Sequence, residues 1–358
     1  MVEPISACNS PADFGPSDPA RVVTTRRRPR VYRASCSLSR VSILRSRLVV
    51  VIDIRSRVSF QEMLRTILII GVISLLLITA CENDEVEADP GLSVVVTTTI
   101  IGDIVRNIVG ADATVEVLVP TGADPHDYQP SSRQVASINK ANLVVAIGLG
   151  LEEALVDVLA AAEKDGANIL EIAPLLDPIP LGNNLDPHVW LDPSRMAEAA
   201  RFIAVEMARI DASIDWSSRA EVYAIELDIT HREIESILEA VPRDSRNLVT
   251  DHDALGYFAA VYGFEIVGTV IPGGSTLGAP SSDDLAKLVR MIELEGVVAI
   301  FAEMTESSAL ASAVAAEVGH EVEVVELYTG SLGEPGSGAD TLVRMMLTNA
   351  KLIAEALG

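Results

Sequence analysis

Cysteine is almost absent from the sequence. Only Cys8, Cys36 and Cys81 occur among the 358 residues, and Cys81 is the one thiol beyond residue 62. The long remainder of the chain therefore cannot form an internal disulfide, and its stability has to come from a hydrophobic core. The 278 residues from Cys81 to the end of the chain are enough for two packed lobes.

Basic residues are scarce in the same part of the chain. From Cys81 onward there are 15 Lys and Arg against 46 Asp and Glu, a net charge of −31. This excess of negative charge argues against nucleic acid as a partner and favours a cation. The chain also lacks the phosphate-binding pattern GxxxxGKS/T of an ATPase and the zinc-protease pattern HExxH.

Residues 1–62 have the opposite character. They hold 11 Arg, no Lys and five acidic residues, a net charge of +6. So sharp a change in charge indicates two unrelated pieces. This Arg- and Ser-rich extension fits a transit peptide or a basic nucleic-acid arm. The segment that follows it favours a third explanation, a basic extension over 1–62 that is disordered or is an over-extended start absent from the mature protein.

Long apolar runs are also missing, since a comfortable membrane span needs about 20 apolar residues. The run at 67–78 is shorter and follows Met63 and a single basic residue, Arg65. Together with the small residues after it, the run has the pattern of a secretory signal peptide over 63–80. The alternative is a buried core helix, which the acidic segment after the run makes a poorer explanation.

The signal pattern ends in Ile-Thr-Ala-Cys, at residues 78–81. This ending resembles a bacterial lipobox, in which the cysteine is lipidated and becomes the first residue of the mature chain. We therefore expect lipidation of Cys81, and an acidic tether over 81–91.

Strand-like and helix-like patterns alternate along 92–192. The β-branched stretches at 92–99, 113–120 and 141–148 predict strands, with helical patterns at 100–110 and 130–141. The same alternation resumes over 245–358. This rhythm predicts an α/β fold with two (β/α) lobes and mostly parallel sheets.

Residues 193–244 differ from both of these regions in composition and pattern. The stretch from 194 to 241 contains no Gly, no Pro and no strand-like run. It predicts two helices, the second about 25 residues long from Trp216 to Ala240. We expect this long α-helix to bridge the two lobes.

Three of the five histidines share a local context. His126, His188 and His252 each follow a strand or loop end, and each has an aspartate close by in sequence, the three being Asp124, Asp186 and Asp251. Ligand sites of open α/β sheets gather outside the carboxyl ends of the strands, and imidazole is a common zinc ligand. The aspartates could orient the rings. From the residues alone, a shared metal site and three separate structural histidines both remain open.

A series of stretches resembles the zinc/manganese solute-binding lipoproteins of bacterial ABC importers, a family that includes proteins once named adhesins. In chain order they are PTGADPHDYQPSSRQVASINKANLVVAIGLGLE, DPHVWLDP, TDHDALGYFAAVYGFEIVG, GGSTLGAPSSDDLAKL, AIFAE and LYTGSLGEPGSGADTLVRMMLTNAKLIAEAL. They cover nearly all of 92–358. The resemblance implies two lobes joined by a rigid long helix, with an ion in the cleft between them.

The resemblance also implies the ligands. Those of the first lobe would be His126 and His188, and that of the second lobe His252. A fourth ligand is usually an Asp in a LYTDSLG-like motif, but here LYTGSLG places Gly330 at that position. Water, Glu303 and Glu334 are the candidates for the fourth position. We expect zinc first and manganese second, because three imidazoles suit zinc better than the harder manganese.

The function that follows is capture of a divalent metal ion outside the cell membrane and delivery to an ABC transporter permease and its ATPase. We expect no enzymatic activity, no nucleic-acid partner and a monomer, held by a lipid anchor on the outer face of the bacterial cytoplasmic membrane. Two alternatives use the same residues. One is a zinc-dependent hydrolase or hydratase with an open fourth coordination position, and the other is a surface adhesin with a structural metal.

Overall fold

The structure is a computed structural model that describes residue 65 and residues 91–358. Contacts within the chain divide it into two units, Met1–Glu82 and Asn83–Gly358, and the fold below is that of 91–358. The expected basic extension, signal peptide and lipidation site at Cys81 lie outside the described residues. Within the described part, none of the helices is long and apolar enough to span a bilayer.

The first lobe is built on a four-stranded parallel sheet in the order β2-β1-β3-β4. Its strands are β1 (Leu92–Val96), β2 (Ala113–Val117), β3 (Leu143–Ala146) and β4 (Ile169–Glu171). Its helices are α2 (Thr99–Val109), α3 (Ser132–Ile138), η1 (Glu153–Leu155) and α4 (Val156–Lys164). Strand β3 is buried at all four positions, as expected for a strand covered on both faces of the sheet.

The second lobe repeats this plan. Its parallel sheet has the order β10-β9-β7-β8, with strands β7 (Asn247–Thr250), β8 (Glu265–Thr269), β9 (Ala299–Glu303) and β10 (Glu323–Leu327). The helices between them are α7 (Gly256–Tyr262), α8 (Ser282–Glu295) and α9 (Ala309–Glu317). Two parallel sheets with helical connections confirm the predicted α/β class.

Short elements lead out of the first lobe. They are η2 (Ala173–Leu175), the antiparallel hairpin of β5 (Pro180–Leu181) and β6 (Asn184–Leu185), and η3 (Val189–Leu191). Another short helix, η4 (Arg243–Ser245), leads into the second lobe.

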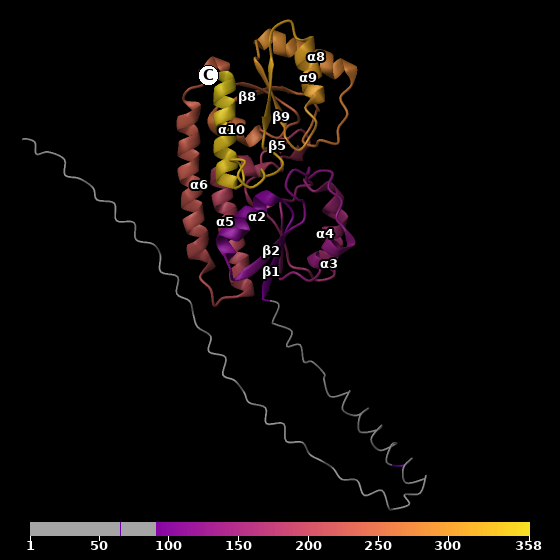
Figure 1. The fold of residues 1–358 in the computed structure, drawn as a ribbon, viewed down its shortest axis with the longest axis vertical. Helices are drawn as coiled ribbons and strands as arrows, with labels where there is room; N and C mark the ends of the chain where they lie inside the picture. The colour runs from indigo at the N-terminus through magenta and orange to yellow at the C-terminus, as the bar shows by residue number, and fades with distance from the viewer. Residues whose placement is uncertain (1–64, 66–90) are drawn as a thin grey trace, which may run out of the picture. The chain divides into compact units, whose positions relative to one another are not determined.

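Helices α5 (Pro193–Ile210) and α6 (Trp216–Leu238) join the two lobes. Figure 1 shows α6 running beside both lobes, with the final helix α10 (Leu342–Leu357) lying along it. The prediction placed the end of the long helix at Ala240, two residues too late. Pro242 disfavours the helical conformation at the residue before it, and the chain leaves the helix ahead of it.

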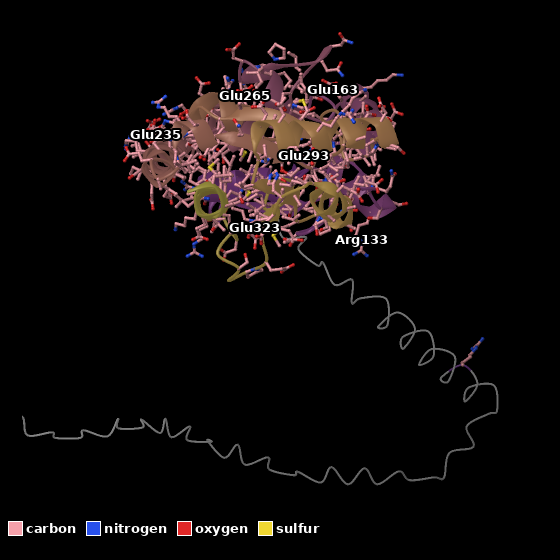
Figure 2. All side chains as sticks on the ribbon, turned by 90° about the horizontal axis from the view of Figure 1, so that it is seen from above. Arg133, Glu163, Glu235, Glu265, Glu293 and Glu323 are labelled. Atoms are coloured by element: carbon pink, nitrogen blue, oxygen red, sulfur yellow. The ribbon has the colours of Figure 1, made fainter. Side chains whose placement is uncertain are left out.

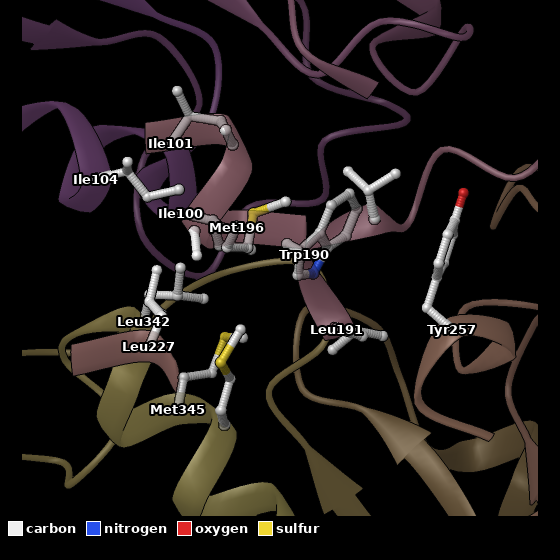
Figure 3. Close-up of a cluster of buried hydrophobic side chains, with 14 of the residues drawn as sticks. Ile100, Ile101, Ile104, Trp190, Leu191, Met196, Leu227, Tyr257, Leu342 and Met345 are labelled. Atoms are coloured by element: carbon white, nitrogen blue, oxygen red, sulfur yellow. The ribbon is translucent and has the colours of Figure 1, made fainter. Parts of the chain in front are cut away.

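One hydrophobic core extends through both lobes and the helices that join them. In Figure 3 side chains of α2, α6 and α10 point toward one another, and the labelled residues include Ile100, Ile104, Leu227, Leu342 and Met345. Each lobe has a second, smaller cluster on the far side of its sheet. Because interiors are close-packed and transmit strain, this shared core holds the two lobes in a defined relation.

Most of the acidic residues lie on the outer surface. The labelled glutamates of Figure 2 lie on the outside of several different elements, and they are Glu163, Glu235, Glu265, Glu293 and Glu323. Most of the negative charge is therefore solvated, and a buried acidic residue is an exception that calls for a partner.

Candidate metal site

The structure brings the three histidines together. The ring centroids of His126, His188 and His252 lie 5.1 to 5.6 Å apart. One nitrogen from each ring falls within 4.8 Å of the other two. The rings come from the connections that follow β2, β6 and β7, so they meet where the two lobes face each other.

The tripeptide Asp-Pro-His holds both rings of the first lobe. One carboxylate oxygen of Asp124 accepts the N–H of His126 at 2.8 Å. Asp186 accepts the N–H of His188 in the same way at 2.9 Å. An Asp side chain that bonds the backbone two residues on makes a tight turn, and proline fixes the dihedral angle φ in between. The repeated Asp-Pro-His motif is therefore a local structure that orients a histidine ring.

His252 is held by the end of strand β7. The N–H of Asp251 donates to the carbonyl of Phe301 on the neighbouring strand at 3.0 Å. The hydroxyl of Thr250 donates to the carbonyl of His252 at 2.7 Å. The turn after β7 is thus fastened to β9 on one side and to the last strand residue on the other.

All three rings are shut off from solvent, with 1 to 2% of each residue exposed. Burial lowers the pKa of His126, and it lowers those of His188 and His252 well below the usual histidine value. Repulsion between the neighbouring rings lowers the pKa of His188 and His252 further. The rings are therefore neutral at neutral pH, and each has a lone pair to give to a metal.

The Nε2 atoms of His188 and His252 face each other at 3.2 Å. Two nitrogens that bind one tetrahedral zinc ion at about 2.1 Å are about 3.4 Å apart. The pair is therefore already close to the separation that a shared ion requires. Neutral imidazole is a donor that suits zinc and other transition metals.

The other nitrogens of the rings have acidic neighbours. His188 Nδ1 lies 2.8 Å from Asp186, and His252 Nδ1 lies 3.4 Å from Glu303. His126 Nδ1 is 3.9 Å from Glu153 and has no hydrogen-bond partner among the described residues. A carboxylate on the far nitrogen fixes the tautomer and orientation of a metal-binding ring.

Burial also raises the pKa of two carboxyl groups, those of Asp186 and Glu303, although the hydrogen bonds that they accept act to lower it. The pKa of Asp186 rises to about 7, and that of Glu303 also rises to about 7. A cation between the rings would favour the charged form of each carboxyl group.

The expected role of the three aspartates is only partly right. Asp186 does bond a ring, but Asp124 bonds the backbone of His126, and Asp251 accepts the N–H of Glu303 at 3.0 Å. Glu303 therefore takes the place beside the His252 ring that we expected Asp251 to fill.

Glu303 and Glu334, the two acidic candidates for the fourth ligand, differ in burial and in location. Glu303 is 3% exposed and lies beside His252. Glu334 is exposed, on a loop that lines a different cavity of about 280 Å³. Gly330 lies close to both Glu303 and Pro125.

Two features of the site had no signal in the sequence. The loop 270–281 between β8 and α8 reaches the first lobe, where Thr276 donates to Asp124 and Ser275 donates to Glu153. Trp190 Nε1 donates to the carbonyl of Thr329 at 2.7 Å, again from one lobe to the other. Both are contacts between segments more than 100 residues apart, which only the folded chain can show.

Known proteins share this fold, at 25 to 31% sequence identity. The family model for zinc-uptake complex component A, periplasmic, matches residues 94–356. The manganese-binding lipoprotein MntA of Bacillus subtilis (strain 168) is 31% identical over 292 residues, which is 78% of this chain and 95% of that protein. The solved structure of the periplasmic zinc-binding protein TroA from Treponema pallidum has a TM-score of 0.71 and 27% identity, over 75% of this chain and 99% of that one.

A third relative was solved with manganese bound. The Mn-bound periplasmic metal-binding protein of Candidatus Liberibacter asiaticus has a TM-score of 0.65 and 25% identity, over 75% of this chain and 100% of that one. A family match over 263 of the 358 residues, from 94 to 356, leads to one conclusion. The chain belongs to the zinc-uptake complex component A (ZnuA) family of periplasmic metal-uptake proteins.

Proposed function

We propose that this protein captures one divalent transition-metal ion outside the cytoplasmic membrane and delivers it to the permease of an ABC importer. The ion is cargo, held by Nε2 of His188 and His252 and by one ring nitrogen of His126. The single observation that carries the proposal is the convergence of three buried, neutral imidazoles from separate loops within 4.8 Å.

Zinc is the first choice of ion and manganese the second. Three imidazole nitrogens form a donor set that favours zinc over the harder manganese. The relatives differ in the metal for which they are named, since MntA is named a manganese-binding lipoprotein and TroA a zinc-binding protein. Charge balance supports any divalent ion, because Asp186 and Glu303 together can offset a charge of +2.

Delivery of the ion requires that the protein lie outside the membrane and that its permease partner lie within it. We propose that Cys81 is lipidated after removal of the signal peptide 63–80, so that a monomer is tethered to the outer face of the membrane by the segment 81–91. The signal pattern supports this placement, and so do the lipoprotein names of relatives such as MntA. The permease and its ATPase would then receive the ion from the cleft.

The closure of the site supports a carrier over the alternative of a zinc hydrolase. A catalytic zinc needs room for a substrate beside its open position. Here the three histidines are almost fully covered, and the cavity lined by His252 and Glu303 has a volume of only about 10 Å³. We therefore propose that the protein has no enzymatic activity of its own.

The test is zinc titration of the purified protein by calorimetry, in the wild type and in His252→Ala. We expect one ion per chain and a loss of affinity of more than ~100-fold in the variant, since loss of a ligand should exceed the loss of an outer partner. His320→Ala is the matched control, because His320 is exposed on the second lobe and bonds the carbonyl of Val297. Unchanged affinity in His252→Ala would refute the site.

A further inference from the structure

The outer nitrogen of His126, Nδ1, is buried and makes no hydrogen bond to any of the described residues. A buried polar atom without a partner is unfavourable and calls for one. A carboxylate oxygen of Glu153, Oε1, lies 3.9 Å from it. The first of the stretches that resemble the metal-binding family ends at Glu152, so the resemblance implies no role for Glu153.

The backbone at Glu153 is held in place by the residue before it. The side chain of Glu152 is buried, and its carboxylate accepts three hydrogen bonds. The donors are the hydroxyl of Thr97 at 2.6 Å and the N–H groups of Ile147 at 2.9 Å and Gly148 at 3.1 Å. These bonds fasten the turn after β3 to the end of β1, so the side chain of Glu153 starts from a fixed point.

The carboxylate of Glu153, in contrast, has room to move. Its side chain is 41% exposed and lines a cavity of about 490 Å³. The turn after β3, the β5–β6 hairpin and the loop 270–281 enclose this cavity. A shift of Oε1 by about 1 Å would bring it within hydrogen-bond distance of Nδ1 of His126.

Glu153 also contacts the second lobe. Its Oε1 accepts the hydroxyl of Ser275, on the loop 270–281, at 2.5 Å. The backbone of this loop passes close to another ring of the site, since a Cβ atom built on Gly274 would lie 3.9 Å from Cε1 of His188. A carboxylate oxygen has two lone pairs. Oε1 can therefore accept a second proton donor, from His126, and keep its bond to Ser275.

We propose that Glu153 is the positioning residue of His126, accepting its Nδ1 proton when Nε2 holds the ion and linking the ring to Ser275 on the second lobe. This inference rests on the proposed function. A neutral ring that binds an ion through Nε2 carries its proton on Nδ1, and Glu153 is the acceptor in reach. It differs from Asp186 and Glu303, which are 1% and 3% exposed, because it lies in contact with solvent.

The first experiment measures zinc affinity by competition with a chromophoric chelator. We expect Glu153→Ala to weaken binding by about tenfold, the lower end of the usual cost of losing an outer carboxylate partner. Glu153→Gln keeps a hydrogen-bond acceptor and should lose less. Glu163→Gln is the matched control, since Glu163 is exposed on α4 of the same lobe and its loss removes the same charge. This control should bind zinc like the wild type.

Proton NMR of the zinc-loaded protein gives a readout that a purely structural role would not change. A ring N–H that donates to a carboxylate makes a short, strong hydrogen bond, and its proton resonates downfield. We expect such a signal from Nδ1 of His126 in the wild type. It should be lost in Glu153→Ala and move upfield in Glu153→Gln, while the signals of His188 and His252 stay in place.

Ser275→Ala tests the link to the second lobe. The variant should release zinc about fivefold faster than the wild type, an effect typical of one lost hydrogen bond. In the Glu153→Ala background the same change should have no further effect, because Ser275 has already lost its acceptor there.

The inference is wrong if Glu153→Ala binds zinc like the wild type, or if it keeps every downfield ring signal. It is also wrong if Ser275→Ala lowers the affinity as much as Glu153→Ala does, because Glu153 would then act through the loop alone. Each of these results leaves the proposed function intact, provided that His252→Ala still loses zinc. If the wild type binds no zinc or manganese at all, the proposed function fails first.

Discussion

The hydroxyl of Thr276, on the second lobe, donates a hydrogen bond to Asp124 on the first lobe. The other carboxylate oxygen of Asp124 accepts the N–H of His126. A single carboxylate therefore fastens the loop 270–281 across the cleft and orients one of the three rings. Ser275, the preceding residue, makes a second such link to Glu153 at 2.5 Å. These two contacts close the cleft over the site.

Thr276→Val should speed the release of zinc. The change keeps the shape of the side chain but removes the donor, and a hydrogen bond to a charged group contributes about 1.5 kcal/mol or more, which corresponds to ~10-fold. The measurement is the dissociation rate after mixing the zinc-loaded protein with excess chelator. Thr114→Val is the matched control, since Thr114 is exposed on β2 in the first lobe. Equal rates in Thr276→Val and the wild type would show that the contact does not hold the cleft closed.

Zinc affinity should fall as the pH drops through about 7. The pKa values of Glu303 and Asp186 both lie at about 7, because burial disfavours their charged forms, so below this pH protons on these two carboxyl groups compete with the ion for the site. The histidine pKa values are lowered by burial, so ring protonation weakens binding only further below 6.5. Zinc binding near pH 6.5 therefore releases protons, and affinity rises with pH up to about 7.

Glu303→Gln is the control for this pH dependence. The variant lacks the carboxyl group, so it should release up to one proton fewer per zinc near pH 6.5 than the wild type does. Calorimetry in two buffers with different ionisation enthalpies counts these protons. Equal proton release by the two proteins would contradict the assignment of this step to Glu303.

Much of the fold could be predicted from the sequence, because the strands of its sheets are short β-branched stretches. The stretch 92–99 became β1, and 113–120 became β2. Strand β4, three residues long, and the two-residue strands of the β5–β6 hairpin carry too little pattern to be seen. The two helices of 193–244 were clear from the absence of Gly and Pro over most of that stretch.

The ring cluster could be anticipated only in part. The Asp-Pro-His turns of His126 and His188 are formed by neighbouring residues, so the motif can be read directly from the sequence. The approach of Glu303 to His252 is not local, since it depends on the pairing of β7 with β9. His231, on helix α6, is partly covered and bonds the hydroxyl of Tyr262 at 3.1 Å, a contact that the sequence does not indicate.

Zinc binding should change the fluorescence of Trp190 and not that of Trp216. The Trp190 ring lies 5.2 Å from the His188 ring, and its Nε1 bonds the segment next to Gly330. Trp216, the only other tryptophan, begins α6 and bonds the carbonyl of Asp211. Trp190→Phe should abolish the zinc-dependent signal, and Trp216→Phe should keep it. A signal that follows Trp216 instead would mean that the ion binds elsewhere.

Removal of the metal should leave both lobes folded. The hydrophobic core does not depend on the three histidines, so a chelator should leave the far-UV circular dichroism unchanged. Zinc at about 1,000 times its Kd should still stabilise the protein by about 4 kcal/mol. For a domain of this size this raises the Tm by about 10 °C. Unfolding on chelation would favour the alternative of a structural metal.

The most direct test of the central claim is a crystal structure of the zinc-loaded protein with anomalous data collected at the zinc edge. We predict one anomalous peak per chain, about 2.1 Å from a ring nitrogen of His126, His188 and His252, with Glu303 bonded to Nδ1 of His252. A strong peak away from these rings, or none at full zinc occupancy in solution, would contradict the assignment of these histidines as the metal site.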